Sequence, residues 1–260
     1  MRVAVLSDIH GNLPALEAVL AEVEAAAPDL IVLNGDLADG PFPAETLDVL
    51  MGLGDRATWV RGNGDRWVTE AYDGTFERTG GPADDLVEWT ATKLSRAHRD
   101  RLAALSLTTS VEIPGLGDVA FCHASARSDN EMVLVTSDVD HLREALGPLP
   151  QETVVAGHCH MPFDRLFDRR RIVNAGAVGM PYGHVGASWA LLGPDVVLRR
   201  TMYDLDAAAA RIARSGMPDA EGFVRENVCT TPSDAEALEV FGKLLREQQD
   251  SGMFASTSGD

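Results

Sequence analysis

Short runs dominated by apolar residues alternate with amphipathic segments over the first sixty residues of the chain. Residues 2–6, 30–33 and 57–60 form such runs, which are typical of strands buried on both faces of a sheet. Between them, residues 13–23 repeat apolar side chains at helical spacing, and residues 44–51 show a second helical pattern. This β-α-β-α-β order predicts a parallel sheet with right-handed crossovers.

The pattern becomes polar and helical from residue 66 to residue 107, with a Gly80-Gly81-Pro82 break inside it. We interpret this stretch as a helical cap inserted into the α/β domain. Strand-like runs resume at residues 119–122 and 153–156. Three more apolar runs follow, at residues 172–173, 187–192 and 196–198. Their close spacing predicts antiparallel hairpin strands.

Helical patterns return near the C-terminus. We divide the chain into a main domain of residues 1–203, C-terminal helices in residues 204–250 that pack on the same domain, and a tail of residues 251–260. The tail is rich in serine and glycine, so we expect it to be disordered.

Composition and charge narrow the class of protein. The 260 residues are 45% hydrophobic and 24% charged, which suits a globular protein with a sizeable core. The formal net charge is -18 and no basic groove stands out, so we expect no nucleic-acid partner. Three cysteines without a C-x-x-C pair suit a reducing, cytoplasmic location. The first apolar run is too short for a signal peptide or a membrane span, so we expect no membrane partner.

Residue types that ligate metals follow five of the strand-like runs. They form the clusters Asp8-Ile9-His10, Gly35-Asp36, Gly62-Asn63-Gly64-Asp65, His123, and Gly157-His158-Cys159-His160. In an α/β sheet, the loops at the carboxyl ends of the strands meet at a common crevice. Each cluster alone is more often a turn, a helix cap or a satisfied histidine. All five in succession therefore predict a shared metal site.

In this order the clusters resemble the D-x-H, G-D, G-N, H and G-H-x-H pattern of the calcineurin-like metallophosphoesterase superfamily. The resemblance covers roughly residues 1–200, and residues 8–13 and 174–181 are similar to loops of its small bacterial and archaeal phosphodiesterase-like branch. The predicted fold is accordingly α/β, a layered α/β/β/α sandwich of two mixed β-sheets flanked by helices, with the small helical cap insertion at about residues 66–107.

The resemblance also implies two metal sites that share one carboxylate. One site would consist of Asp8, His10, Asp36 and His160, and the other of Asp36, Asn63, His123 and His158. Imidazole, carboxylate and amide ligands suit Mn²⁺, Fe²⁺/Fe³⁺, Zn²⁺, Co²⁺ or Ni²⁺, and we expect Mn²⁺ to favour activity.

The predicted activity is hydrolysis of a small phosphorylated substrate, either a phosphodiester or a phosphomonoester. Two cations about 3.5–4 Å apart can ionise a bridging water and clamp phosphate oxygens, so that the hydroxide attacks phosphorus directly. Asp36 and Asn63 would then be catalytic residues as well as ligands. No G-x-S-x-G elbow or reactive-cysteine motif indicates a covalent route.

One position departs from the family pattern. Many members read Gly-Asn-His-Asp or Gly-Asn-His-Glu, and that histidine is thought to protonate the leaving group, whereas this chain has Gly64. Asp39 resembles the aspartate that partners this histidine, so we expect it to lack its companion; it and His184 are candidate substitute acids. Asn12, Arg66 and His184 are the candidate substrate contacts, with a surface salt bridge as the alternative for Arg66.

Other residues of the helical stretches are interpreted as structural. His98 and His141 are predicted to be solvated. Trp67, Tyr72 and Trp89 are predicted to anchor helices to the core, with stacking on an aromatic substrate as the alternative.

Two further functions stay open at this point. A catalytically weak protein of this fold could be a protein-interaction scaffold, as the retromer subunit of the same fold is, and the missing histidine favours this alternative. The seven filled ligand positions argue against it. A nuclease is disfavoured by the net charge of -18. The sequence also leaves a homo-oligomer open.

Overall fold

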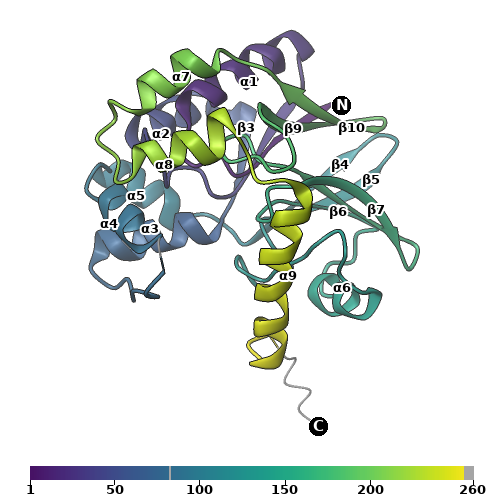
Figure 1. Cartoon of the computed structure of the whole chain (residues 1–260). Coiled ribbons are helices and arrows are strands. Elements are labelled where there is room, and N and C mark those ends of the chain that lie inside the picture. Colours follow the sequence, from purple (N-terminus) through teal and green to yellow (C-terminus); the bar gives the residue numbers. More distant parts are fainter. Residues whose placement is uncertain (82, 255–260) are drawn as a thin grey trace.

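The computed structural model describes residues 1–81 and 83–254, which form two five-stranded sheets with helices on their outer faces (Figure 1). The first sheet has the strand order β10-β9-β1-β2-β3 and the second the order β4-β5-β6-β8-β7. This arrangement confirms the predicted α/β class with two mixed sheets flanked by helices.

The first sheet contains the parallel strands predicted from the N-terminal pattern. Its strands are β1 (Val3–Leu6), β2 (Leu30–Asn34), β3 (Ala57–Val60), β9 (Ala187–Leu192) and β10 (Val196–Thr201). Strands β1, β2 and β3 run parallel, as predicted. Strands β9 and β10 form an antiparallel hairpin, also as predicted, and β9 pairs antiparallel with β1.

The second sheet was only partly predicted. Its strands are β4 (Thr108–Ile113), β5 (Gly117–Cys122), β6 (Thr153–Ala156), β7 (Pro162–Phe167) and β8 (Arg170–Ala175). The apolar run at residues 172–173 lies in β8, which pairs with β6 and β7 and not with the β9–β10 hairpin. This run is therefore a strand of an antiparallel hairpin, as predicted, but its hairpin partner is β7 and not β9, because the chain crosses to the other sheet after β8.

The two sheets pack face to face through an apolar layer. Val3 and Val5 of β1 lie in one buried cluster with Val119 and Phe121 of β5. The alternate β1 residues face the opposite way, toward helix α1, because successive side chains of a strand point to opposite faces. The N-terminal strands are thus buried on both faces, as their uninterrupted apolar sequence requires.

Helices cover both outer faces (Figure 1). The helices are α1 (Leu13–Ala26), α2 (Pro43–Met51), α3 (Asn63–Asp73), α4 (Asp84–Ala91), α5 (Arg96–Ala103), α6 (Val139–Leu146), α7 (Leu205–Ile212), α8 (Ala220–Val224) and α9 (Asp234–Asp250), with a 3₁₀ turn at Gly54–Arg56 and a π-helical turn at Arg225–Cys229. Helices α1 and α2 bury apolar side chains against the first sheet, and α6 and α9 do so against the second. No helix within the described residues is both long and apolar enough to cross a membrane.

The segment predicted as a cap contains α3, α4 and α5, which lie together at one side of the molecule (Figure 1). Trp67 and Tyr72 pack against the core cluster of the first sheet, and Trp89 packs against the cluster formed by α7 and α8, which agrees with an anchoring role. Pro82 of the predicted break and residues 255–260 of the predicted tail lie outside the described residues.

Two histidines predicted to be solvated are buried instead. The Nε2 atom of His98 lies 2.9 Å from Asp48 Oδ1, and that of His141 lies 2.8 Å from the carbonyl oxygen of Met132. Each histidine follows a capping residue, Ser95 or Asp138, by three positions, so the N-terminal turn of its helix points it inward.

Candidate metal centre

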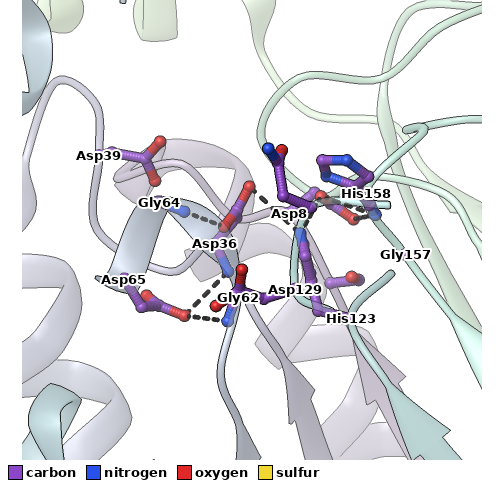
Figure 2. A network of polar contacts seen from close by, with 12 residues as sticks. Asp8, Asp36, Asp39, Gly62, Gly64, Asp65, His123, Asp129, Gly157 and His158 are labelled. Atoms are coloured by element: carbon purple, nitrogen blue, oxygen red, sulfur yellow. Dashed lines mark hydrogen bonds and ion pairs between the residues drawn. The ribbon is translucent and has the colours of Figure 1, made fainter. Parts of the chain in front are cut away.

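The seven predicted ligands lie together at the carboxyl ends of β1, β2, β3, β5 and β6. None is more than 8% exposed. Asp8, His10 and His160 form one group of potential ligands and Asp36, His123 and His158 a second, with one donor atom per residue all within 4.8 Å of one another in each group. Figure 2 shows Asp8, Asp36, His123 and His158 converging from separate segments. Each of these groups lies within one of the two predicted ligand sets, and a third group joins His10, Asp36 and Asp39.

The backbone at these ligands adopts an unusual conformation. Five ligand residues have a positive φ, namely Asp8 (54°), His10 (46°), Asp36 (53°), His158 (66°) and His160 (58°). Left-handed conformations of non-glycine residues cost roughly 1–3 kcal/mol each and persist where the surrounding structure enforces them. Their concentration in one small region indicates a functional site.

The spacing between donor atoms fits shared cations. His10 Nε2 lies 3.1 Å from His160 Nε2, and His160 Nε2 lies 3.3 Å from Asp8 Oδ1. Two ligands at about 2.0–2.1 Å from one ion stand about 3 Å apart. Asp36 Oδ2 lies 3.8 Å from His10 Nε2 and 3.3 Å from His123 Nε2, so it reaches both groups. This is the position that a bridging carboxylate requires.

Two histidines are oriented by hydrogen bonds on the far side of the ring. His123 Nδ1 lies 2.8 Å from the carbonyl oxygen of Asn34, and His10 Nδ1 lies 3.1 Å from Asp39 Oδ2. Such partners hold Nε2 toward a metal and fix the tautomer. Within the described residues, the buried atoms His158 Nε2 and His160 Nδ1 have no hydrogen-bond partner.

The side-chain amide of Asn63 also fits a metal ligand. One amide atom of Asn63 lies 2.9 Å from His158 Nδ1, 3.3 Å from His123 Nε2 and 3.0 Å from the carbonyl oxygen of Asp129. If this atom is the nitrogen, it donates to these acceptors. If it is the oxygen, it faces only acceptors unless a cation lies between them. A cation bound between Asn63, His123 and His158 would therefore favour the orientation that presents the amide oxygen.

Backbone N–H groups hold the carboxylates in place (Figure 2). Asp36 Oδ1 accepts from Gly64 N (2.7 Å) in the first turn of α3, where the helix dipole favours negative charge. The carboxylate of Asp65 accepts from Gly62 N (2.8 Å), Asp36 N (3.1 Å) and Leu37 N (3.0 Å). Both oxygens of Asp8 lie 3.1 Å from His158 N. The loops after β1, β2, β3 and β6 are thus tied to one another.

Close approach of these loops requires glycine at position 62. A Cβ there would lie 2.2 Å from Asp36 Oδ1 and 2.3 Å from Asp36 N. A Cβ added at Gly64 would stand 2.7 Å from Asp39 Oδ2, so Asp39 fills the space that a larger residue 64 would use. We expected Asp39 to lack a companion; it pairs with His10 instead.

Without a bound cation, some of the buried groups at this site are charged at pH 7 and others are neutral. Although burial opposes it, His123 and His10 hold the pKa of Asp36 well below its usual range. Burial likewise opposes protonation of His123 and His10, yet the neighbouring carboxylates, Asp36 for His123 and Asp39 for His10, raise their pKa values to about 10 and about 9. Burial and the charge of His123 lower the pKa of His158 to about 4. His158 is therefore neutral at pH 7 and ready to bind a metal.

We expect binding of two divalent cations at pH 7.5 to release about two protons, because His10 and His123 must lose theirs to become ligands. Titration calorimetry in buffers of different ionisation enthalpy measures this number. Because the pKa values of His10 and His123 are raised, their protonation fully stabilises the metal-free fold at pH values below 6.5, the ordinary pKa of histidine. This contribution to stability is lost as the pH rises through 9 and 10. Metal affinity should rise over the same interval. Metal binding without proton release would contradict these protonation states.

The three residues predicted to contact the substrate lie in different surroundings. Asn12 is fully buried, accepts from Ala15 N (3.3 Å) and donates to Gly179 O (2.9 Å), so it caps α1 and cannot reach a substrate. Arg66 is paired with Asp129 and Glu70, which is the salt-bridge alternative, although its side chain remains 32% exposed. His184 is half-buried and is not among the grouped ligands.

Two residues near the centre carried little signal in the sequence. Asp65 is tied to the Asp36 loop, and its spacing of three from Gly62 is a capping-box spacing that could have indicated this role. Burial and the charge of Asp36 raise the pKa of Asp65 to about 7. Tyr182 stacks on the ring of His160, with centroids 5.1 Å apart, and no motif indicated this contact.

Comparison with known proteins agrees with this arrangement. The model of the calcineurin-like phosphoesterase superfamily domain matches residues 1–195. An uncharacterised protein of Methanocaldococcus jannaschii is 27% identical over 240 residues, covering 84% of this chain and 94% of that protein. The structure of a metallophosphoesterase from Sphaerobacter thermophilus matches with a TM-score of 0.67 and 27% identity, over 86% of this chain and 97% of that one. A hypothetical protein of Pyrococcus horikoshii shares the fold, with a TM-score of 0.73 and 20% identity over 86% of this chain and 96% of its own.

Proposed function

Because the chain belongs to the calcineurin-like phosphoesterase superfamily, we propose that it is a dinuclear metal-dependent phosphoesterase that hydrolyses phosphodiesters or phosphomonoesters. The observation that carries the proposal is the pair of ligand groups, Asp8–His10–His160 and Asp36–His123–His158, with Asp36 in reach of both. Mn²⁺ is the favoured metal, and Fe, Zn²⁺, Co²⁺ and Ni²⁺ also suit these ligands.

The chain's own residues account for how such a centre would be held. A pair of cations would supply the activation of water and the neutralisation of phosphate charge. Asp36 contributes the shared negative charge, and its hydrogen bond from Gly64 N fixes the carboxylate in one orientation. Asn63 would contribute an amide oxygen from the first turn of α3. Asp39 orients His10, so we propose that it positions a ligand and does not act as the acid.

The proposal includes a small substrate and a cytoplasmic location. A chain with a net charge of -18 repels large polyanions such as nucleic acids. A pair of bound cations would reverse the field only locally, which suits a small phosphorylated substrate. The three cysteines are free, which suits a reducing compartment.

Substrates with good leaving groups should be turned over much faster than simple alkyl esters. No imidazole can stand at position 64 to protonate the departing oxygen, and general acid catalysis typically contributes about 10²–10⁴-fold. For substituted phenyl diesters we expect kcat to fall steeply as the pKa of the phenol rises. A kcat that does not depend on the phenol pKa would show that another group supplies the proton.

The direct test is hydrolysis of an aryl phosphodiester and an aryl phosphomonoester by purified protein that is first stripped of metal and then reloaded. We expect activity with Mn²⁺, little activity after chelation, and two bound cations per chain. A protein that binds two cations but hydrolyses none of a panel of nucleotides, cyclic nucleotides and sugar phosphates would instead support the scaffold alternative.

A further inference from the structure

The imidazole of His160, a candidate metal ligand, stacks on the ring of Tyr182. The ring centroids are 5.1 Å apart and the ring planes differ by 26°, within the range that aromatic pairs favour. The backbone nitrogen of Tyr182 also lies 3.4 Å from the carbonyl oxygen of His160. A side-chain contact and a backbone contact therefore join the loop between β8 and β9 to this ligand.

His160 differs from two other candidate ligands in what holds its ring. His10 Nδ1 pairs with Asp39, and His123 Nδ1 lies 2.8 Å from a backbone carbonyl oxygen. His160 directs Nε2 toward the first ligand group, 3.1 Å from His10 Nε2, and its buried Nδ1 has no hydrogen-bond partner among the described residues. Hydrogen bonds from those residues therefore do not set the plane of the His160 ring.

The backbone of the ligand loop does not set this plane either. Asn174 donates to the carbonyl oxygen of Gly157 and thereby holds the loop that carries His160. The torsion between Cβ and the imidazole ring is nevertheless broad, so a histidine without a partner at its far nitrogen can adopt a range of ring planes. A metal ligand needs one of these planes, because Nε2 must point at the ion. Stacking on Tyr182 restricts the His160 ring to planes close to that of the phenol.

Helix α9 supports Tyr182 in turn. The ring of Phe241 contacts the Tyr182 ring with centroids 5.6 Å apart, and both rings pack against the apolar core cluster of the second sheet. Phe241 follows the residues 1–195 that match the family domain. A helix outside that match therefore reaches a candidate metal ligand through two successive aromatic contacts.

We infer that Tyr182 is a positioning residue that holds the His160 ring in the plane needed for metal binding, and that α9 supports it through Phe241. The inference rests on the proposed function and adds to it a contribution of the C-terminal helix. Hydrogen-bond partners that orient metal ligands typically contribute about 10–100-fold to metal affinity. A stacked ring is a weaker restraint than a hydrogen bond to a carboxylate, so we expect an effect of about tenfold.

Tyr182→Leu tests the stack. Leucine keeps an apolar side chain against the core cluster but offers no planar ring to His160. When Mn²⁺ is titrated into the metal-stripped, full-length variant, calorimetry should show about tenfold weaker binding of one of the two cations. The rise in melting temperature caused by Mn²⁺ should shrink accordingly. This rise compares the variant with its own metal-free form, so a general loss of stability does not produce the effect.

Three further variants locate the effect. Tyr182→Phe keeps the ring and removes only the hydroxyl, so it should bind Mn²⁺ within about twofold of the unmodified protein. Phe241→Ala leaves Tyr182 in place but removes its support, so it should weaken Mn²⁺ binding by a smaller factor than Tyr182→Leu. Leu245→Ala is the matched control on α9, since Leu245 lies one turn beyond Phe241 and packs against the same core cluster. Its Mn²⁺ affinity should be unchanged.

The outcomes distinguish this inference from the proposed function. Equal Mn²⁺ affinity in Tyr182→Leu and Tyr182→Phe would overturn the positioning role in a protein that still binds two cations and hydrolyses aryl esters. Weak binding in Tyr182→Phe would also overturn it, because the hydroxyl and not the ring would then act on the centre. If the unmodified protein bound no Mn²⁺, the proposed function would fall and this inference with it.

Discussion

Asp36→Asn should lower phosphodiester hydrolysis by at least about 10³-fold and reduce the bound metal from two ions to one or none. Asp36 is the carboxylate within reach of both ligand groups, so its neutral amide replacement removes the shared negative charge. The polarisation and charge neutralisation that a metal pair supplies are worth several kcal/mol, which corresponds to a loss of this size. Enzymatic rates and metal analysis of the same purified sample measure the two effects together.

The fold should survive this substitution. Asparagine has nearly the same shape, and its side-chain oxygen can keep the hydrogen bond from Gly64 N. The matched control is Asp164→Asn on β7, which removes the same charge from an exposed ion pair with Arg171 of β8. That variant should retain two metals and full activity. Retained activity in Asp36→Asn would refute the bridging role of this residue.

Gly62→Ala should reduce activity by about 10²-fold or more through displacement of the same carboxylate. The added Cβ would stand 2.2 Å from Asp36 Oδ1 and 2.3 Å from Asp36 N, and the second contact cannot be relieved by a side-chain rotation. Gly62 has φ -95°, which alanine adopts without strain, so the effect arises from the contact alone. A misplacement of about 1 Å in a catalytic arrangement costs about this much. Steady-state rates and Mn²⁺ affinity provide the measurement.

Gly52→Ala is the control for this second substitution. Gly52 lies at the C-terminal end of α2 with φ -63°, and its nearest neighbour would be 3.2 Å from the added Cβ. Its activity and metal affinity should match those of the unmodified protein. If Gly62→Ala behaved in the same way, the loop after β3 would not be held against Asp36 as the structure shows.

The N-terminal half of the metal centre was accessible from the sequence because local patterns and topology agree there. Apolar runs separated by helical patterns predict parallel strands, and each run ends two or three residues before a ligating residue. Once β1, β2 and β3 are parallel and adjacent, Asp8, Asp36 and Asn63 must lie at one edge. How the ligands divide between two metal sites was implied only by the resemblance to the calcineurin-like superfamily.

Edge strands and long-range contacts were not accessible in the same way. Strands β4 and β7 lie at sheet edges and carry exposed polar residues, so they lack the apolar run of a buried strand. The β8 run was placed in the wrong hairpin because sequence proximity does not reveal a crossover between sheets.

Partners of buried polar groups are equally hard to predict. The ring of buried His98 has its partner fifty positions earlier in the chain, where the Asp48 carboxylate accepts a hydrogen bond from Nε2–H. The pairing of Asp39 with His10 depends on the approach of two loops, which no local pattern records.

Side chains far apart in the sequence should hold two cations around Asp36. Anomalous scattering from crystals of the Mn²⁺-loaded protein tests it most directly. Two peaks about 3.5–4 Å apart are expected, one within Asp8, His10 and His160 and the other within Asn63, His123 and His158, with the Asp36 carboxylate between them. No peak among these residues, or a single peak that Asp36 does not contact, would contradict the account.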